Sequence, residues 1–195
     1  MGSRIPPRPR EELSPKEQEE YDHFSKQSEF GFGKNGEKFL YKDASNGAFI
    51  GPYPFLQAAP DTGKMALELV FSVSRIAPLP ADVKETAILT AGGHFQAAYE
   101  LYAHANVAVK SGVLSRAQVD VLKSDRKPGD LNGNCSLAYD VAKYLCGQKG
   151  PLPKEDWERS VRAFGKEGTL ALVHYIGYYA YLCIALNAVD ASVPE

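Results

Sequence analysis

The sequence predicts an all-α domain, and three observations carry that prediction. After Pro60 the apolar residues recur at helical spacing, most clearly between Met65 and Ile76. No stretch of useful length beyond residue 60 alternates apolar and polar residues as a half-buried strand does. Proline, glycine and capping residues also fall where helices of ordinary length would begin or end. With 195 residues, the chain is long enough for one domain with a sizeable core.

The first 44 residues are predicted to form a partly irregular arm in front of a helical domain over residues 45–195. Residues 1–20 contain four prolines among charges of both signs and few apolar side chains, so we expect mobile or draped chain there. A short helix followed by irregular chain is expected over residues 21–39. Residues 47–55 predict an extended, turn-rich segment, because a residue that precedes proline disfavours the helical conformation.

Beyond residue 60 the periodicity predicts a series of helices separated by short breaks. The breaks are expected at Pro78 with Pro80, at Gly92 with Gly93, at Gly112 and in the turn-forming residues 124–134. Ser115 followed by Gln118 has the form of a capping box and marks a helix start. The helices are expected at about residues 61–76, 82–91, 95–110, 116–122, 135–146, 153–164 and 166–187.

The charge pattern argues against a nucleic-acid partner. The net charge is −2, and the Lys and Arg residues are dispersed rather than gathered into the basic stripe that a phosphate backbone requires. Residues 1–10 have no apolar run behind their arginines and therefore lack the form of a secretory signal. We expect the protein to be cytoplasmic.

One apolar stretch, residues 170–186, approaches the length of a membrane span. It contains His174 and four tyrosines, which are costly in hydrocarbon. We interpret it as a buried or subunit-contact helix and expect no membrane partner.

Three cysteines, Cys135, Cys146 and Cys183, are separated by 11 and 37 positions. These separations match neither a zinc site nor an even disulfide set. A reducing compartment fits them best, and we expect the thiols to be small core residues.

The most unusual predicted helix covers residues 95–110. Within it Glu100 and His104 lie four positions apart and so share one helical face. A carboxylate raises the basicity of a neighbouring imidazole and fixes its orientation, which suits the pair to proton transfer. The alternative is an ordinary surface pair worth a few tenths of a kcal/mol. Ala97 and Leu101 share the face, which indicates that it points inward, where a Glu and a His need polar partners.

Glu85 on the preceding helix is a third candidate. It follows Lys84 and precedes the apolar residues 87–89, so the sequence allows its side chain to face water or to point across the hairpin. If Glu85 points across, three titratable groups converge in one pocket.

These residues resemble a known superfamily. Its peroxidase branch, the alkylhydroperoxidase D-like proteins, carries a Glu, a Cys twelve positions later, a second Cys three positions on, and a His four positions after that. The corresponding residues here are Glu85, Ala97, Glu100 and His104, so the Glu and the His match and both cysteines are replaced. The sequence segments around these residues are similar to those of the carboxymuconolactone decarboxylase-like branch, in which the motif Tyr-Glu-x-x-x-His is frequent. The resemblance covers about residues 47–193.

The resemblance implies an alkylhydroperoxidase D-like helical fold with a central helical hairpin that carries the site, assembled as a homo-oligomer. Thiol-dependent peroxide reduction needs an attacking thiolate and a resolving partner, and neither Ala97 nor Glu100 can serve. Cofactor-free acid–base chemistry is therefore expected. A metal site of Glu85, Glu100 and His104 is possible on ligand type, but the resemblance does not support it, so we expect no metal and no cofactor.

The leading interpretation is a lyase of the decarboxylase type, or an isomerase or dehydratase, that acts on a small carboxylated lactone or polyketide-like acid. His104 would hold a developing oxyanion or protonate carbon, Glu100 would set its charge, and Glu85 would be a second acid–base group. The candidate substrate-binding residues are His94, Tyr99 and His174. A structural role is the alternative for His94, and a hydrogen-bonded core position is the alternative for His174.

Two other functional classes stay open. One is a non-catalytic binding or assembly protein of the same fold, and the other is a residual thiol-dependent redox protein, which needs another cysteine close to His104. A buried pocket shared by Glu85, Glu100 and His104 favours an enzyme, whereas side chains that diverge into solvent favour the assembly protein.

Overall fold

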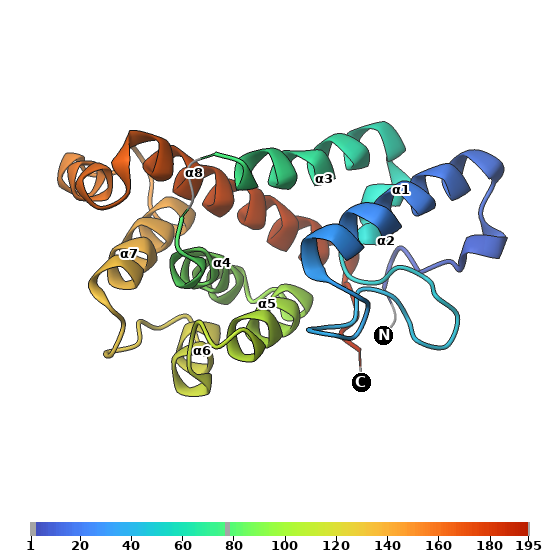
Figure 1. Ribbon diagram of the computed structural model, residues 1–195, viewed down its shortest axis with the longest axis horizontal. Helices are drawn as coiled ribbons and strands as arrows, with labels where there is room; N and C mark the ends of the chain where they lie inside the picture. The colour runs from blue at the N-terminus through green and yellow to red at the C-terminus, as the bar shows by residue number, and fades with distance from the viewer. Residues whose placement is uncertain (1–2, 77–78, 195) are drawn as a thin grey trace.

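The structure of the chain, a computed structural model, describes residues 3–76 and 79–194 and is all-α (Figure 1). The described residues contain no strand, only an isolated antiparallel bridge between Lys42 and Phe49. The helices are η1 (Arg10–Glu12, a 3-10 turn), α1 (Pro15–Phe32), α2 (Tyr53–Ala58), α3 (Pro60–Ser74), α4 (Ala81–Phe95), α5 (Ala98–Lys110), α6 (Arg116–Lys123), α7 (Gly133–Gly147) and α8 (Lys154–Val189). The predicted fold class is confirmed.

The α4–α5 hairpin lies at the centre of the fold, with α7 and α8 packed against α4 (Figure 1). Helix α4 is buried along almost its whole length because its neighbours cover it on several sides. A tight connection joins the two helices, and within it Gln96 adopts a left-handed conformation with φ of 51°. The short connection sets α5 beside α4, so side chains from both helices can meet across the hairpin.

The predicted helix stop at Gly92 and Gly93 is wrong, because α4 continues through both residues to Phe95. The glycines serve close packing instead. A β-carbon at Gly92 would press on the side chain of Leu101, and one at Gly93 would collide with the backbone carbonyl of Leu122. They allow α5 and α6 to approach α4 at distances that a larger residue would prevent.

Most other boundaries beyond residue 60 agree with the prediction. Helix α6 starts at the expected capping box, in which Ser115 accepts from the Gln118 backbone and the Gln118 side chain accepts in return. The long C-terminal helix contains a break at Gly165, where φ is 70° and ψ is 170°, in agreement with two predicted helices on either side. The predicted break at Pro78 lies outside the described residues, while Pro80 caps α4.

Helix α8 is long and apolar enough to cross a membrane by length and composition, and it is the one described helix of that kind. Its most apolar window is 61 % buried inside the molecule. Leu172, Ile176 and Cys183 on this helix are among the buried core residues. This burial agrees with the predicted buried or subunit-contact helix.

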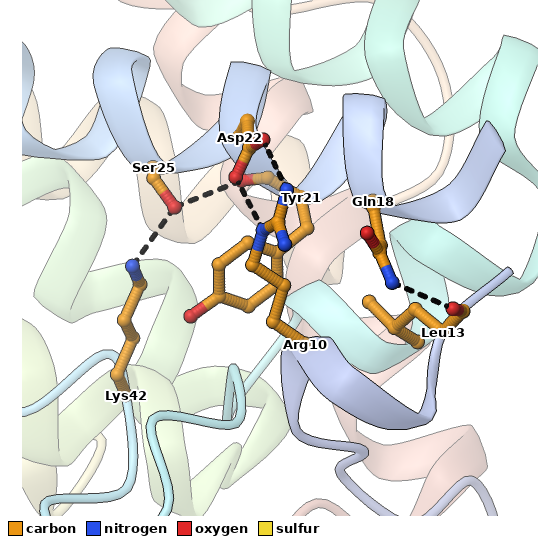
Figure 2. A network of polar contacts seen from close by, with 7 residues as sticks. All are labelled: Arg10, Leu13, Gln18, Tyr21, Asp22, Ser25 and Lys42. Carbon is orange, nitrogen blue, oxygen red and sulfur yellow. Dashed lines mark hydrogen bonds and ion pairs between the residues drawn. The ribbon is translucent and has the colours of Figure 1, made fainter. Parts of the chain in front are cut away.

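The N-terminal segment is more ordered than its composition predicts. Helix α1 begins at Pro15, inside the stretch expected to be irregular, because Ser14 and Glu17 form a reciprocal capping box and proline is tolerated in a first helical turn. Arg10 holds Asp22 through two hydrogen bonds of 2.8 Å, and Lys42 donates to Ser25 at 2.8 Å (Figure 2). These bonds tie the start of the chain and the segment after α1 to the same helix.

An aromatic cluster fixes this segment onto the rest of the fold. The rings of Phe49 and Tyr53 stack with centroids 4.4 Å apart, and Tyr21 approaches Phe49 at 4.8 Å. The buried Phe24 joins the same core, which also contains Tyr99 of α5. The predicted boundary at residue 44 stays a prediction, but residues on both sides of it share one apolar core.

The segment expected to be extended through Phe55 turns into α2 at Tyr53. A turn at Gly51, with φ of 68°, precedes the helix, and Pro52 and Pro54 occupy its cap and first turn. Proline is compatible with those positions because the first backbone N–H groups of a helix have no intrahelical acceptor. The sequence signal for a turn was right, and its extension over residues 53–55 was wrong.

Candidate functional site

The α4–α5 hairpin brings Glu85, Glu100 and His104 together. The Nδ1 atom of His104 lies 2.9 Å from Oε2 of Glu85, a hydrogen bond in which the ionised carboxylate accepts the ring proton. On the other side of the ring, Nε2 of His104 lies 3.2 Å from Oε1 of Glu100. Glu85 therefore points across the hairpin, and one imidazole lies between two carboxylates.

All three groups are buried. The side chains of Glu85, Glu100 and His104 retain 12 %, 4 % and 7 % of their exposure. The alternative of an ordinary surface pair is therefore wrong for Glu100 and His104. Burial of charge is costly unless the charges are paired, and here each ring nitrogen faces an oxygen of opposite charge.

The surroundings of Glu100 and His104 shift the pKa values of both groups upward. Burial raises the pKa of Glu100 to about 7, and the charge of Glu85 adds to the rise while His104 opposes it. Burial lowers the pKa of His104, but the charge and hydrogen bond of Glu85, together with the charge of Glu100, outweigh it and leave the pKa raised. Near neutral pH the Glu100 carboxyl is close to half protonated, and the raised pKa of His104 favours the cationic form of its ring.

A cavity of about 410 Å³ opens beside Glu85 and His104. We call it the outer cavity. Val70 and Phe71 of α3, Ile88 of α4 and Tyr175 of α8 give it mostly apolar walls, and Phe32 of α1 closes another side. This volume is within the range of small-molecule sites, which combine apolar walls with a few convergent polar groups.

A second, inner cavity of about 40 Å³ lies on the Glu100 side of the ring. It is lined by Glu100, His104 and four tyrosines: Tyr53, Tyr99, Tyr178 and Tyr179. A space of this size holds about two water molecules. Burial raises the pKa of each of these tyrosines, so their hydroxyls stay neutral beside Glu100.

His104 and Tyr179 line both cavities and form part of the wall between them. Their rings meet edge to face, with centroids 4.9 Å apart and an interplanar angle of 84°. This ring contact and the two carboxylates together restrict rotation of the imidazole. The cluster is thus held rigidly with Glu85 toward the outer cavity and Glu100 toward the inner one.

The three predicted substrate-binding residues lie in different environments. Tyr99 is buried and lines the inner cavity, but its hydroxyl donates to the carbonyl of Leu40 at 2.7 Å. His94 lies in the last turn of α4, not at a helix start as expected, with its ring against Phe95, and lines neither the outer nor the inner cavity.

His174 is exposed on α8 and also lines neither of these cavities. The alternative of a hydrogen-bonded core position for His174 is wrong, because the helix turns this residue outward while its neighbour Tyr175 faces inward. The structure thus brings together the three predicted catalytic residues and Tyr99, and separates His94 and His174 from them.

Several residues that line the outer cavity escaped the sequence analysis. Lys38 comes from the segment between α1 and α2, and Lys84 comes from α4, directly before Glu85. Tyr175 and Tyr179, four positions apart on α8, were seen only as part of an apolar helix. Their spacing puts them on one face and was a usable signal, whereas nothing in the local sequence around Lys38 points to a cavity.

The cysteines lie away from this chemistry. Cys135 and Cys183 are buried, Cys146 is partly buried, and all three are free thiols. Burial raises the pKa of Cys135 and Cys146 to about 11 and raises that of Cys183 further, so thiolates are scarce at neutral pH. None of the three lines the outer or the inner cavity.

The donor arrangement is a poor match for a resident metal ion. Both nitrogens of His104 already face carboxylate oxygens, and these oxygens lie on opposite sides of the ring instead of converging on one point. Across residues 3–76 and 79–194, no group of three or more His, Cys, Asp and Glu side chains has an arrangement suited to a metal.

Sequence comparison finds no matching family model and no curated protein with significant similarity. Among solved structures, a cysteine-to-alanine variant of the debrominase Bmp8 in complex with 2,3,4-tribromopyrrole is similar, with a TM-score of 0.72 over 100 % of this chain and 93 % of that one. Apo Bmp8 is similar with a TM-score of 0.70 over 93 % and 90 % of the two chains. Identity is 14 % in both cases.

This likeness extends over essentially the whole chain and shows the fold. The chain shares the all-α fold of these Bmp8 structures, and its α4–α5 hairpin lies at the centre of the fold, as predicted.

Proposed function

We propose that the protein is an enzyme that carries out cofactor-free acid–base chemistry on a small carboxylated lactone or polyketide-like acid. The observation that carries the proposal is the buried imidazole of His104 between Glu85 and Glu100, at the wall of a cavity of about 410 Å³. Paired titratable groups with shifted pKa values beside a cavity are typical of catalytic sites. The enzymatic function of Bmp8, a debrominase of the same fold, is consistent with it.

Decarboxylation is the reaction we favour. The bond between the carboxylate and the neighbouring carbon breaks, carbon dioxide leaves, and the electron pair moves into a conjugated carbonyl to form an enolate. The cationic ring of His104 would stabilise the negative charge on that enolate oxygen across the outer cavity. A proton delivered to carbon then completes the product.

Glu85 is the group best placed to exchange protons with the substrate. The Oε2 atom of Glu85 is hydrogen-bonded to His104, while its Oε1 atom has no hydrogen-bond partner among the described residues. The Glu85 side chain also lines the outer cavity. The ionised carboxylate of Glu85 can accept the proton on Nδ1 of His104 and pass it to the substrate carbon, and Glu100 on the other side of the ring can then return a proton to His104. We therefore assign proton transfer at the substrate to Glu85 and charge stabilisation to His104.

Glu100 would restore the proton on the far side of the ring. Its pKa of about 7 makes it an effective proton donor and acceptor at neutral pH, and it lies 3.2 Å from Nε2 of His104. The same parts would support isomerisation or dehydration, because those reactions also move protons next to a carbonyl. Cytoplasmic residence and a homo-oligomeric assembly complete the proposal.

The test is a substrate screen that separates these reactions. Purified protein is incubated with unsaturated lactone acids and β-keto acids in D₂O, and carbon dioxide and deuterium incorporation are measured by gas analysis and proton NMR. Decarboxylation releases carbon dioxide, whereas isomerisation incorporates deuterium without gas release. Replacement of His104 by Ala should lower turnover by about 10²-fold or more, and equal turnover by that variant would contradict the mechanism.

Two controls address the other functional classes. Iodoacetamide treatment should leave turnover unchanged, because no cysteine lines either cavity; loss of turnover would favour the thiol-dependent alternative. Binding of these acids without turnover would favour a binding protein, and absence of both binding and turnover would favour an assembly protein.

A further inference from the structure

We infer that Lys38 and Lys84 form the anion-binding element of the outer cavity and select substrates that carry a carboxylate on an apolar body. The inference rests on the proposed function for its site and deepens it by assigning specificity to two residues. Both lysines line the cavity, and they come from separate parts of the chain: Lys84 from α4 and Lys38 from the segment after α1.

The charge count of the cavity supports an anionic ligand. Among its lining residues, Lys38, Lys84 and His104 carry positive charge and Glu85 carries negative charge. Glu85 is already paired with His104 at 2.9 Å. Within the described residues, neither lysine ammonium has a carboxylate within 4.0 Å, whereas Lys127 and Lys143 elsewhere in the molecule do. Two lysines of the cavity lining are therefore without a carboxylate partner among the described residues.

The ammonium group of Lys84 lies close to the wall of the outer cavity. Its Nζ lies 5.9 Å from the centre of the Tyr175 ring, which forms another part of the cavity lining, so the ammonium stays at the wall through a cation–π contact. Lys84 directly precedes Glu85 on the same helix. Because Lys84, Glu85 and His104 line the same cavity, an anion held by Lys84 is within reach of the proton-transfer groups.

The position of Lys38 depends on the N-terminal segment. The Nζ of Lys110 at the end of α5 donates to the backbone carbonyls of Lys38 and Glu37, which fastens this part of the chain over the hairpin. Phe39 next to Lys38 is buried in the aromatic core. The segment before residue 45 thus supplies one charged wall of the cavity.

The remaining lining narrows the ligand class. The walls between the lysines and the acid–base cluster are largely aromatic and aliphatic, including Phe71, Ile88 and Tyr179. Between such walls, burial of a doubly charged phosphate ester costs more than burial of a singly charged carboxylate. A flat apolar molecule with a carboxylate matches this combination better than a phosphate ester does.

The test compares the binding of three probes that share one ring system: 2-naphthoate, neutral 2-naphthamide and 2-naphthyl phosphate. Dissociation constants are measured by isothermal titration calorimetry at low and at physiological salt. The wild-type protein should bind 2-naphthoate about tenfold or more tightly than 2-naphthamide, with a preference that falls as salt rises. Tighter binding of 2-naphthyl phosphate than of 2-naphthoate would overturn the assignment to a carboxylate.

Variants of the two lysines test whether these residues cause the preference for 2-naphthoate over 2-naphthamide. Lys38→Met and Lys84→Met should each weaken 2-naphthoate binding about fivefold while leaving 2-naphthamide binding within about twofold, and the double variant should abolish the preference. The matched control is Lys64→Met, which removes the same charge from an exposed position of α3 outside the cavity and should change neither constant. An undiminished preference in the double variant would refute the role of these lysines.

A further variant separates this inference from the proposed function. His104→Gln should lose turnover but keep the preference for 2-naphthoate, because the lysines are intact. If His104→Gln loses the preference and the lysine double variant keeps it, His104 is the anion site and the inference fails. If the lysine variants behave as expected but no acid is turned over, the anion site stands and the proposed catalysis fails.

Discussion

Two polar clusters in this molecule are built from similar groups and differ in almost every physical respect. The hairpin cluster of Glu85, Glu100 and His104 is buried, and its carboxylates and imidazole have few other partners. The N-terminal cluster of Arg10 and Asp22 keeps nearly half of its side-chain exposure and is joined by two good hydrogen bonds (Figure 2).

The difference shows how to recognise chemistry in a structure without a ligand. The Arg10–Asp22 pair is exposed to solvent, so water and salt screen the attraction between its charges. Its role is structural, because it links the start of the chain to α1. The hairpin cluster is shielded from water, so its groups interact strongly and Glu100 titrates near neutral pH. Ion pairs in the two clusters therefore carry different meaning, and burial beside a cavity is what distinguishes them.

Among variants of the two clusters, Glu85→Gln should have the largest effect, on the pKa of His104 and on turnover. The amide keeps the shape and can still accept from His104, but it removes the charge that raises the pKa of His104. We expect the pKa of His104 to fall, as followed by NMR titration of its ring, and turnover at neutral pH to fall by about 10²-fold.

The matched control for Glu85→Gln is Glu167→Gln, which neutralises an exposed carboxylate on α8. It should change neither the His104 titration nor turnover. An unchanged His104 pKa in the Glu85 variant would mean that the two groups are not coupled, and the hairpin cluster would then resemble the exposed one.

Glu100→Gln should have the next largest effect, seen in the pH dependence of stability. The pKa of Glu100 is about 7 in the folded protein against an ordinary value of 4.5, so the unfolded chain releases its proton first. The free energy of unfolding should therefore decrease as pH rises from about 4.5 to about 7, by an amount on the order of a few kcal/mol. Glu100→Gln should lack this decrease.

Denaturant titrations at several pH values between 4.5 and 8 measure the effect. The raised pKa of His104 contributes stability that is fully present below about 6.5 and is lost only above it. The lower part of the window thus reports on Glu100. Parallel curves for the wild type and the Glu100 variant over pH 4.5–6.5 would show that the carboxyl is not perturbed.

Arg10→Ala should have a much smaller effect. The Arg10–Asp22 pair is exposed, and exposed pairs contribute little to stability. We expect the Tm to fall by no more than about 2 °C and turnover to stay unchanged. Calorimetry checks the first and the substrate assay checks the second; a change in turnover would tie the N-terminal cluster to the site.

His174→Gln should have the smallest effect. This exposed residue lines neither the outer nor the inner cavity, so its removal should leave the binding constant and turnover within about twofold of the wild type. Steady-state kinetics at several substrate concentrations make the comparison. A large rise in KM would restore the prediction that His174 contacts the substrate, for instance through a neighbouring subunit.

The sequence alone was most informative where local rules act. Helical periodicity, the Ser115 capping box and the spacing of Glu100 and His104 are properties of a few neighbouring residues, and the structure agrees with all of them. The rules misled where two local signals competed. Gly92 and Gly93 predict a helix stop, whereas in the structure they allow close packing within α4, and the prolines of the first 20 residues obscure the cap that starts α1.

What only the tertiary structure decided is how groups far apart in the chain meet. Glu85 had two possible orientations, and the tight turn at Gln96 together with the packing around α4 selected the one that reaches His104. Lys38 and Tyr179 come together in the outer cavity from opposite ends of the chain. Periodicity sets which face of a helix is apolar, but contacts between helices set the depth, the neighbours and hence the pKa of each group on that face.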